Sequence, residues 1–170
     1  YHDSEDIMRY NIEHDVNSEI AEATTVKKEH TILVVEDNAE LRQYIKSALN
    51  PFYKVIEAEN GQEGKILAIS SMPSLILSDI MMPVMDGLKM CRELKEDLRT
   101  SHIPIILLTA RSFLLQMKEG LELGADDYIT KPFNTSLLLL KIGNIIASRE
   151  NLKNLYGKRL SMENMGVDVI

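Results

Sequence analysis

Apolar residues between positions 31 and 146 fall into short runs that alternate with longer stretches of helical spacing. Short unbroken apolar runs are typical of strands buried on both faces, as in a parallel sheet. Apolar residues three and four apart predict helices that begin near residues 41, 60, 88, 113 and 134, with Asn60 and Asn134 as N-caps. The runs themselves predict strands at Thr31–Val35, Lys54–Glu57, Leu75–Ser78, Ile105–Leu108 and Tyr128–Ile129.

This regular alternation of strand and helix predicts the fold class. Strand–helix–strand units of this length form right-handed crossovers, so we expect an α/β protein with a doubly wound five-stranded parallel sheet and helices on both faces. The helical pattern continues past the last unit, which predicts a helical C-terminal extension. Four successive leucines, Leu137–Leu140, cannot all face inward on one helix, so at least one is expected to face solvent or a partner.

Polar side chains stand where the predicted strands end. The first strand is followed by Glu36 and Asp37, and the third by Asp79. The fourth is followed by Thr109, and the fifth leads to Lys131. The carboxyl ends of parallel strands meet at one edge of the sheet, where ligands bind in such folds. These side chains are therefore expected to converge on one site.

Three carboxylates at one edge repel each other unless a cation joins them. Mg²⁺ suits this donor set, because it prefers oxygen ligands and binds through one or two carboxylates together with waters and phosphate oxygens. A lysine and a threonine hydroxyl nearby would contribute a positive charge and a hydrogen-bond donor. The combination fits phosphoryl transfer onto an aspartate, where positioning and charge neutralisation provide most of the catalysis.

Four motifs carry a resemblance to a known family. In order they are ILVVEDN, LILSDIMMPVMDG, PIILLTA and GADDYITKPF, and together they cover roughly residues 30–148. The sequence resembles the receiver domain of bacterial two-component response regulators. The resemblance implies a flavodoxin-like sheet and a domain that accepts a phosphoryl group from a histidine kinase phosphodonor domain. It also implies that this stretch is a phosphoacceptor with self-dephosphorylation rather than an enzyme, although the parent chain is expected to be a histidine kinase.

The resemblance also implies roles for the residues at the strand ends. Asp79 would be the phosphoacceptor, with Mg²⁺ bound by Asp37, Asp79 and the Met81 backbone carbonyl, and by Glu36 through water. Thr109 and Lys131 would contact the phosphoryl group.

The resemblance also implies which residues would transmit the signal and which would set the lifetime of the phosphorylated state. Thr109 would move on phosphorylation and Tyr128 would turn inward, and the surface made by the fourth helix, the last strand and the fifth helix would shift. Met81 and Arg111 would set the rate of hydrolysis. The Lys131–Pro132 peptide is expected to be cis, as the resemblance supports.

Composition and charge bound the remaining possibilities. The chain has 170 residues and a net charge of −7, which argues against a broad nucleic-acid-binding face. No apolar run approaches the roughly 20 residues that span a bilayer, so no membrane contact is expected. The single cysteine, Cys91, cannot form an internal disulfide, and its side chain is expected to pack in the core. The lack of an internal disulfide suits a reducing compartment, so we expect this part of the protein to be cytoplasmic. The parent protein could still be anchored in a membrane.

The chain is expected to have three parts. Residues 1–30 carry eight acidic and three basic residues, which predicts an acidic linker or arm, or a segment that docks on a neighbouring domain. Residues 31–148 form the receiver unit. Residues 149–170 form a helical linker to a downstream module. Because the chain begins at Tyr1, we expect a piece of a larger protein, with a hybrid sensor histidine kinase as the favoured parent and a DNA-binding output as one possibility.

Other readings of the site are an aspartate-nucleophile phosphatase, an FMN carrier and a receiver-like scaffold that is not phosphorylated. The phosphatase usually has a second acid two residues after its nucleophile, where this chain has Met81. The FMN carrier needs a phosphate loop after the first strand, where Glu36 and Asp37 would repel phosphate. Homodimerisation is expected through the fourth and fifth helices or through the C-terminal helix.

Overall fold

A five-stranded parallel sheet forms the centre of the molecule. The computed structural model describes residues 28–116 and 124–164. The strand order is β2-β1-β3-β4-β5, and every neighbouring pair is parallel. The strands are β1 (Thr31–Val35), β2 (Lys54–Ala58), β3 (Leu75–Asp79), β4 (Ile105–Ala110) and β5 (Asp127–Lys131).

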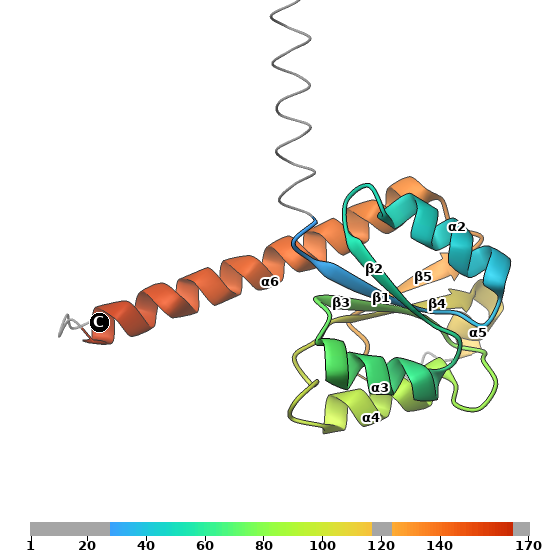
Figure 1. Cartoon of the computed structure of the whole chain (residues 1–170), viewed down its shortest axis with the longest axis horizontal. Coiled ribbons are helices and arrows are strands. Elements are labelled where there is room, and N and C mark those ends of the chain that lie inside the picture. Colours follow the sequence, from blue (N-terminus) through green and yellow to red (C-terminus); the bar gives the residue numbers. More distant parts are fainter. Residues whose placement is uncertain (1–27, 117–123, 165–170) are drawn as a thin grey trace, which may run out of the picture.

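Helices cover both faces of this sheet (Figure 1). Helices α2 and α6 lie on one face, and α3 and α4 lie on the other. No helix in the described residues is long and apolar enough to cross a membrane. The helices are α2 (Ala39–Leu49), α3 (Gly61–Ser71), α4 (Gly87–Glu96), α5 (Arg111–Gln116) and α6 (Thr135–Asn164).

Two hydrophobic layers sandwich the sheet, and together they confirm the predicted fold class. Because successive strand side chains point to opposite faces, Ile32 and Val34 pack under α2 and α6, whereas Leu33 and Val35 pack under α3 and α4. All four are fully buried. Cys91 lies in the second layer and is also fully buried, as predicted from its helical spacing.

Four of the five strands extend further than predicted. Strands β2 and β3 each gain one residue at the carboxyl end, β4 gains two, and β5 runs from Asp127 to Lys131. Parallel pairing continues through these polar residues, because Asp79 pairs with Leu108 and Ala110 with Lys131. Asp79, Thr109 and Lys131 are therefore the last or next-to-last residues of rigid strands rather than loop residues.

The helix starts follow the expected capping chemistry. Asn60 Oδ1 accepts a hydrogen bond from the Glu63 amide (2.9 Å), and Asn134 Oδ1 accepts one from the Leu137 amide (2.7 Å). Asn38 and Asp86 cap α2 and α4 in the same way. The helix predicted from Phe113 to Gly124 is described only as far as Gln116, since residues 117–123 lie outside the described residues. The Lys131–Pro132 peptide is cis, as predicted.

Helix α6 is the longest element and projects well beyond the body of the molecule (Figure 1). It runs without interruption through residue 148, where the receiver unit was expected to end. The four successive leucines, Leu137–Leu140, divide as predicted: Leu138 is fully buried and Leu139 partly buried, whereas Leu137 and Leu140 are 41% and 59% exposed. The amino-terminal half of α6 thus packs on the sheet and also presents leucines to solvent.

Substitution of two of these leucines should change the free energy of unfolding by very different amounts. Leu138→Ala creates a cavity in the core and is expected to lower the free energy of unfolding by about 2–5 kcal/mol. Leu140→Ala removes an exposed side chain and should change it by about 0.5 kcal/mol or less. Urea denaturation followed by circular dichroism measures both values, and similar losses for the two variants would contradict this packing of α6.

A carboxylate cluster at the carboxyl edge of the sheet

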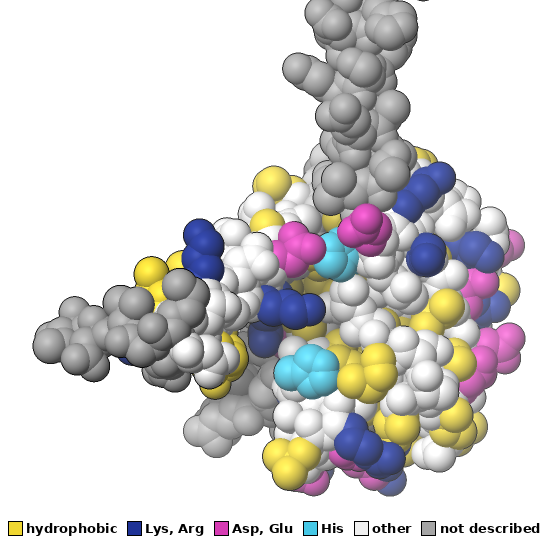
Figure 2. All heavy atoms as spheres, turned by 60° about the vertical axis from the view of Figure 1, so that its left-hand side comes forward, with side chains coloured by type: hydrophobic (Ala, Val, Ile, Leu, Met, Phe, Trp, Pro, Cys, Tyr) yellow, Lys and Arg dark blue, Asp and Glu magenta, His cyan; other side chains and the backbone are white. Residues whose placement is uncertain are grey.

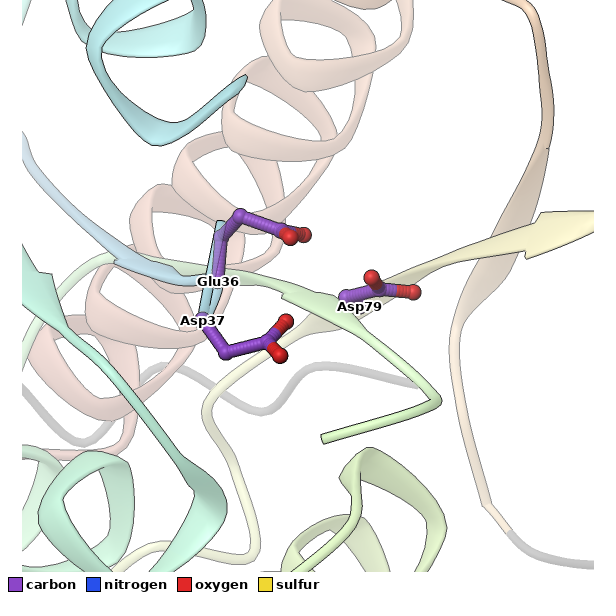
Figure 3. Close-up of side chains that lie close together, drawn as sticks. All are labelled: Glu36, Asp37 and Asp79. Carbon is purple, nitrogen blue, oxygen red and sulfur yellow. The ribbon is translucent and has the colours of Figure 1, made fainter. Parts of the chain in front are cut away.

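Three carboxylates meet at the carboxyl edge of β1 and β3 (Figure 3). These strands are neighbours, with Val35 opposite Ser78, so the residues that follow Val35 lie beside Asp79. Each of Glu36, Asp37 and Asp79 contributes a carboxylate oxygen, and these oxygens all lie within 4.8 Å of one another. The predicted convergence of the three acids is therefore present in the structure.

The three acids differ in their access to solvent. Glu36 is 1% exposed and Asp79 is 8% exposed, whereas Asp37 is exposed. Two carboxyl groups are thus held in a poorly solvated position behind one that faces water. An ion arriving from solvent would meet Asp37 first and the buried pair behind it.

Lys131 supplies the nearest positive charge. Its Nζ lies 2.8 Å from Asp79 Oδ2 and 4.0 Å from Glu36 Oε2. Asp79 Oδ1 accepts a hydrogen bond from the Ile80 amide at 2.7 Å. The Asp79 carboxylate is therefore held at both oxygens, but one ammonium cannot neutralise three carboxylates.

Glu36 lies in a position that disfavours the charged form of its carboxyl group. Burial raises the pKa of its carboxyl to about 8, and the neighbouring Asp79 side chain and its charge act in the same direction. The Asn38 amide, which donates to Glu36 Oε1 at 3.1 Å, and Lys131 oppose this rise in pKa. The other oxygen, Oε2, is buried and has no hydrogen-bond partner among the residues that the structure describes.

This donor set fits a small divalent cation. Among the described residues, the side chains that gather here offer carboxylate oxygens, which suit Mg²⁺ better than a softer metal such as Zn²⁺, which favours nitrogen and sulfur ligands. The unpartnered Glu36 Oε2 and the excess of negative charge are both features that a cation, or a water bound to it, would satisfy.

The remaining predicted residues lie around the cluster without joining it directly. Thr109 is 3% exposed on β4, and its hydroxyl donates to the Ala110 carbonyl (3.3 Å) rather than to Asp79. Met81 is 72% exposed, and Arg111 is exposed at the start of α5. Thr109 and Arg111 thus lie at the carboxyl end of β4, the strand next to β3, and Met81 follows Asp79 by two residues.

Tyr128 is half-buried on β5 and packs against the layer under α3 and α4. Its hydroxyl is buried and has no hydrogen-bond partner in the described residues. Burial is also the main reason why the pKa of this hydroxyl is raised. The ring is therefore directed inward in this structure, and its proposed movement stays a prediction.

Two supporting residues were not predicted as part of the site. Gly87 donates its amide hydrogen to the Ile80 carbonyl (2.9 Å), and a Cβ built on it would lie 2.1 Å from the Asp79 carbonyl oxygen. Arg42 Nη1 donates to the Glu36 carbonyl at 2.7 Å. No local pattern in the sequence reveals the contact between Gly87 and Asp79, because it depends on the path of the folded loop.

Comparison with known proteins agrees with this geometry. Residues 32–143 match the family model described as the response regulator receiver domain. The chain is 46% identical over 155 residues to Histidine kinase P4 of Formosa agariphila, covering 88% of this chain and 11% of that protein. It is 43% identical over 117 residues to the phosphate regulon transcriptional regulatory protein PhoB of Pseudomonas aeruginosa, covering 68% of this chain and 51% of that protein.

Solved structures give the same result. The receiver domain of sensor histidine kinase PA1611 from Pseudomonas aeruginosa PAO1, described with a magnesium ion coordinated in its active site cleft, is 32% identical with a TM-score of 0.64. The match covers 69% of this chain and 98% of that one. The protein described here belongs to the response regulator receiver domain family, and it is a receiver domain of two-component signalling. The chain spans only a small part of the kinase and about half of the regulator it matches.

Removal of the buried Glu36 charge should change the pH dependence of stability. With a folded pKa near 8 against an ordinary value of 4.5, native Glu36 keeps a proton that the unfolded chain releases. Its contribution to stability is therefore fully present below about pH 4.5 and is lost as pH rises through 8. In chelator at pH 8.5, Glu36→Gln should raise the free energy of unfolding by about 2 kcal/mol, with little change near pH 4.5.

Urea denaturation in EDTA across this pH range measures the difference. Glu40→Gln is the matched control, because Glu40 is an exposed acid on α2. Identical pH dependence in the parent protein and in Glu36→Gln would contradict a buried, proton-retaining Glu36.

The close approach of Gly87 to Asp79 gives a second prediction. Gly87→Ala forces a methyl group against the Asp79 main chain and should lower the free energy of unfolding by about 2–4 kcal/mol. Gly157→Ala is the matched control, since a Cβ there meets nothing within 4 Å and alanine favours helix, so this variant should be neutral or slightly more stable. Equal thermal midpoints for Gly87→Ala and the parent would contradict the contact.

Proposed function

We propose that Asp79 accepts a phosphoryl group from the phosphohistidine of a histidine kinase. A carboxylate oxygen of Asp79 attacks phosphorus, the P–N bond to the donor imidazole breaks, and an acyl phosphate forms as the imidazole takes up a proton. The observation that carries this proposal is the Asp79 carboxylate, held between the Lys131 ammonium (2.8 Å) and the Ile80 amide (2.7 Å) at the open edge of the sheet.

The neighbouring residues have distinct roles in this proposal. Lys131 holds the carboxylate in place and would then pair with a phosphoryl oxygen. Thr109 would exchange its bond to the Ala110 carbonyl for one to the phosphoryl group. Met81 and Arg111, both exposed beside the site, would set how easily water reaches the acyl phosphate and hence how fast it hydrolyses.

Mg²⁺ is the proposed cofactor. Asp37 and Asp79 would bind it directly, the Met81 backbone carbonyl would complete the protein ligands, and Glu36 would act through water. When bound, the ion neutralises the carboxylates and the charge on the transferring phosphoryl group. A charged Glu36 would be favoured by the same ion, since its high pKa reflects burial beside another carboxylate.

The proposed output is a change in the surface formed by α5, β5 and α6. Phosphorylation adds almost two negative charges at Asp79 and would draw Thr109 on β4 and Lys131 on β5 toward them. Helix α5 packs against both strands, and Tyr128 lies on β5. The exposed Leu137 and Leu140 give this surface an apolar part that suits a second copy or a partner domain.

We further infer a cytoplasmic receiver within a longer chain. The kinase and regulator relatives support a hybrid sensor kinase as parent and transcription regulation as output. The described receiver unit is not proposed to bind nucleic acid or membrane. A receiver-like scaffold that is never phosphorylated is the alternative that the following experiment addresses.

Incubation with acetyl phosphate and Mg²⁺ should add one phosphoryl group to the protein. Intact-mass spectrometry measures the gain, which is expected to require Mg²⁺ and to be absent in Asp79→Asn, a variant of the same size. Lys131→Ala should reduce the phosphorylated fraction at equal time by about tenfold or more, because the carboxylate loses the only close cation that the described residues provide.

Two controls make the result decisive. Asp86→Asn keeps an N-cap on α4 and removes an exposed acid near the site, and it should still be phosphorylated. Beryllofluoride binding, followed by the change in Tyr128 fluorescence or NMR signals, tests the site without a phosphodonor. Phosphorylation of Asp79→Asn, or no response to either reagent, would contradict the proposal and favour the scaffold.

A further inference from the structure

A groove lies at the amino edge of the sheet, at the opposite end from Asp79. It has a volume of about 680 Å³ and is formed where α6 leaves the body of the domain. Figure 2 shows this face, with histidine, lysine and arginine side chains around a hollow beside the projecting helix. We call it the basal groove; its lining includes His30, Ser74, Pro104, Arg149, Leu152 and Lys153.

Polar contacts fix α6 at one wall of the basal groove. His30 Nε2 lies 2.7 Å from Glu150 Oε1, and Arg149 Nη2 lies 2.8 Å from Asp126 Oδ1. Arg149 Nη1 also donates to the His102 carbonyl at 3.3 Å. These contacts fix the direction in which α6 leaves the domain. They also fix the shape of the groove between α6 and the amino edge of the sheet.

Beyond this corner, α6 carries an exposed apolar stripe continuous with the groove. Its first four members recur at helical spacing, and the fifth lies seven residues after the second, which places all five on one side of the helix. Each is 45% exposed or more, although together they form an apolar surface of the kind that usually packs against something. The α6 stripe consists of Leu152, Leu155, Tyr156, Leu160 and Met162.

The α6 stripe is basic as well as apolar. Lys153 and Lys158 flank it on either side, and Arg159 lies within it by helical spacing. None of the three forms an ion pair with any residue in the described part of the chain. A parallel pair of α6 helices in register would bring Arg159 against its copy, which is unfavourable. The stripe is better matched by a segment that combines carboxylates with apolar side chains.

The same chain contains such a segment, and its sequence ends close to a residue that lines the groove. Residues 1–27 carry seven acidic and two basic residues together with apolar residues such as Ile12, Val16 and Ile20. They join the described structure at Lys28, two residues before His30 in the groove lining. Covalent attachment at this point gives the segment an effective concentration on the order of millimolar at the groove.

We propose that residues 1–27 bind in the basal groove and along the α6 stripe of their own chain. The carboxylates would pair with Lys153, Lys158 and Arg159, and the apolar side chains would cover the stripe. This contact would place the incoming and outgoing ends of the receiver side by side at the amino edge of the sheet. It does not depend on phosphorylation of Asp79.

Amide hydrogen exchange in the full chain tests the proposal. At low salt, exchange of residues 150–162 should be about tenfold slower in the parent protein than in the double variant Glu19→Gln/Glu22→Gln. The difference should disappear in about 0.5 M salt, because it rests on exposed charges. Glu40→Gln/Glu96→Gln removes the same charge from exposed acids on α2 and α4 and should exchange like the parent.

A complementary variant and a mass measurement identify the occupant. Lys153→Gln/Arg159→Gln should lose the same salt-sensitive protection, and light scattering should give a monomer mass throughout. Equal exchange in the parent and Glu19→Gln/Glu22→Gln would overturn the proposal. Protection that increases with protein concentration, together with a doubled mass, would overturn it in favour of a second copy.

Discussion

The repulsion among Glu36, Asp37 and Asp79 is the interaction on which the rest of the site depends. Parallel pairing of β1 with β3 brings these carboxylates within 4.8 Å, and burial of Glu36 and Asp79 removes most of the water that would otherwise screen them. The energy needed to hold such a cluster comes from the apolar layers on both faces of the sheet. A site of this kind is therefore stable because the surrounding fold is rigid, while the cluster itself favours the arrival of positive charge.

Much of this arrangement could be predicted from the sequence because it follows from the positions at which apolar strands end. Glu36, Asp37, Asp79 and Lys131 stand at such positions, and a parallel sheet brings them to one edge whatever the details of packing. The same reasoning placed Leu138 and its neighbours on a helix that cannot bury them all. These predictions rest on the periodicity of the backbone, which the sequence displays directly.

Other features depend on distances that only the folded chain defines. The high pKa of Glu36 arises from burial beside Asp79, which lies 43 positions later in the sequence. The approach of Gly87 to the Asp79 carbonyl depends on the path of the intervening loop. His30 and Glu150 are 120 positions apart, so no local sequence pattern predicts their hydrogen bond. The extra strand residues at Asp79 and Ala110 were missed because pairing with a neighbour, rather than polarity, decides where a strand ends.

Because α6 is long, a small change in its angle to the domain moves its far end by a large distance. About 16 of its residues follow position 148, and at about 1.5 Å per residue they reach roughly 24 Å past the corner fixed by Arg149 and Glu150. A tilt of about 10° at that corner would displace the far end by about 4 Å, roughly the rise of three residues. The far end of α6 thus amplifies any small rearrangement at this corner, which is held by the His30–Glu150 hydrogen bond and the Arg149–Asp126 ion pair.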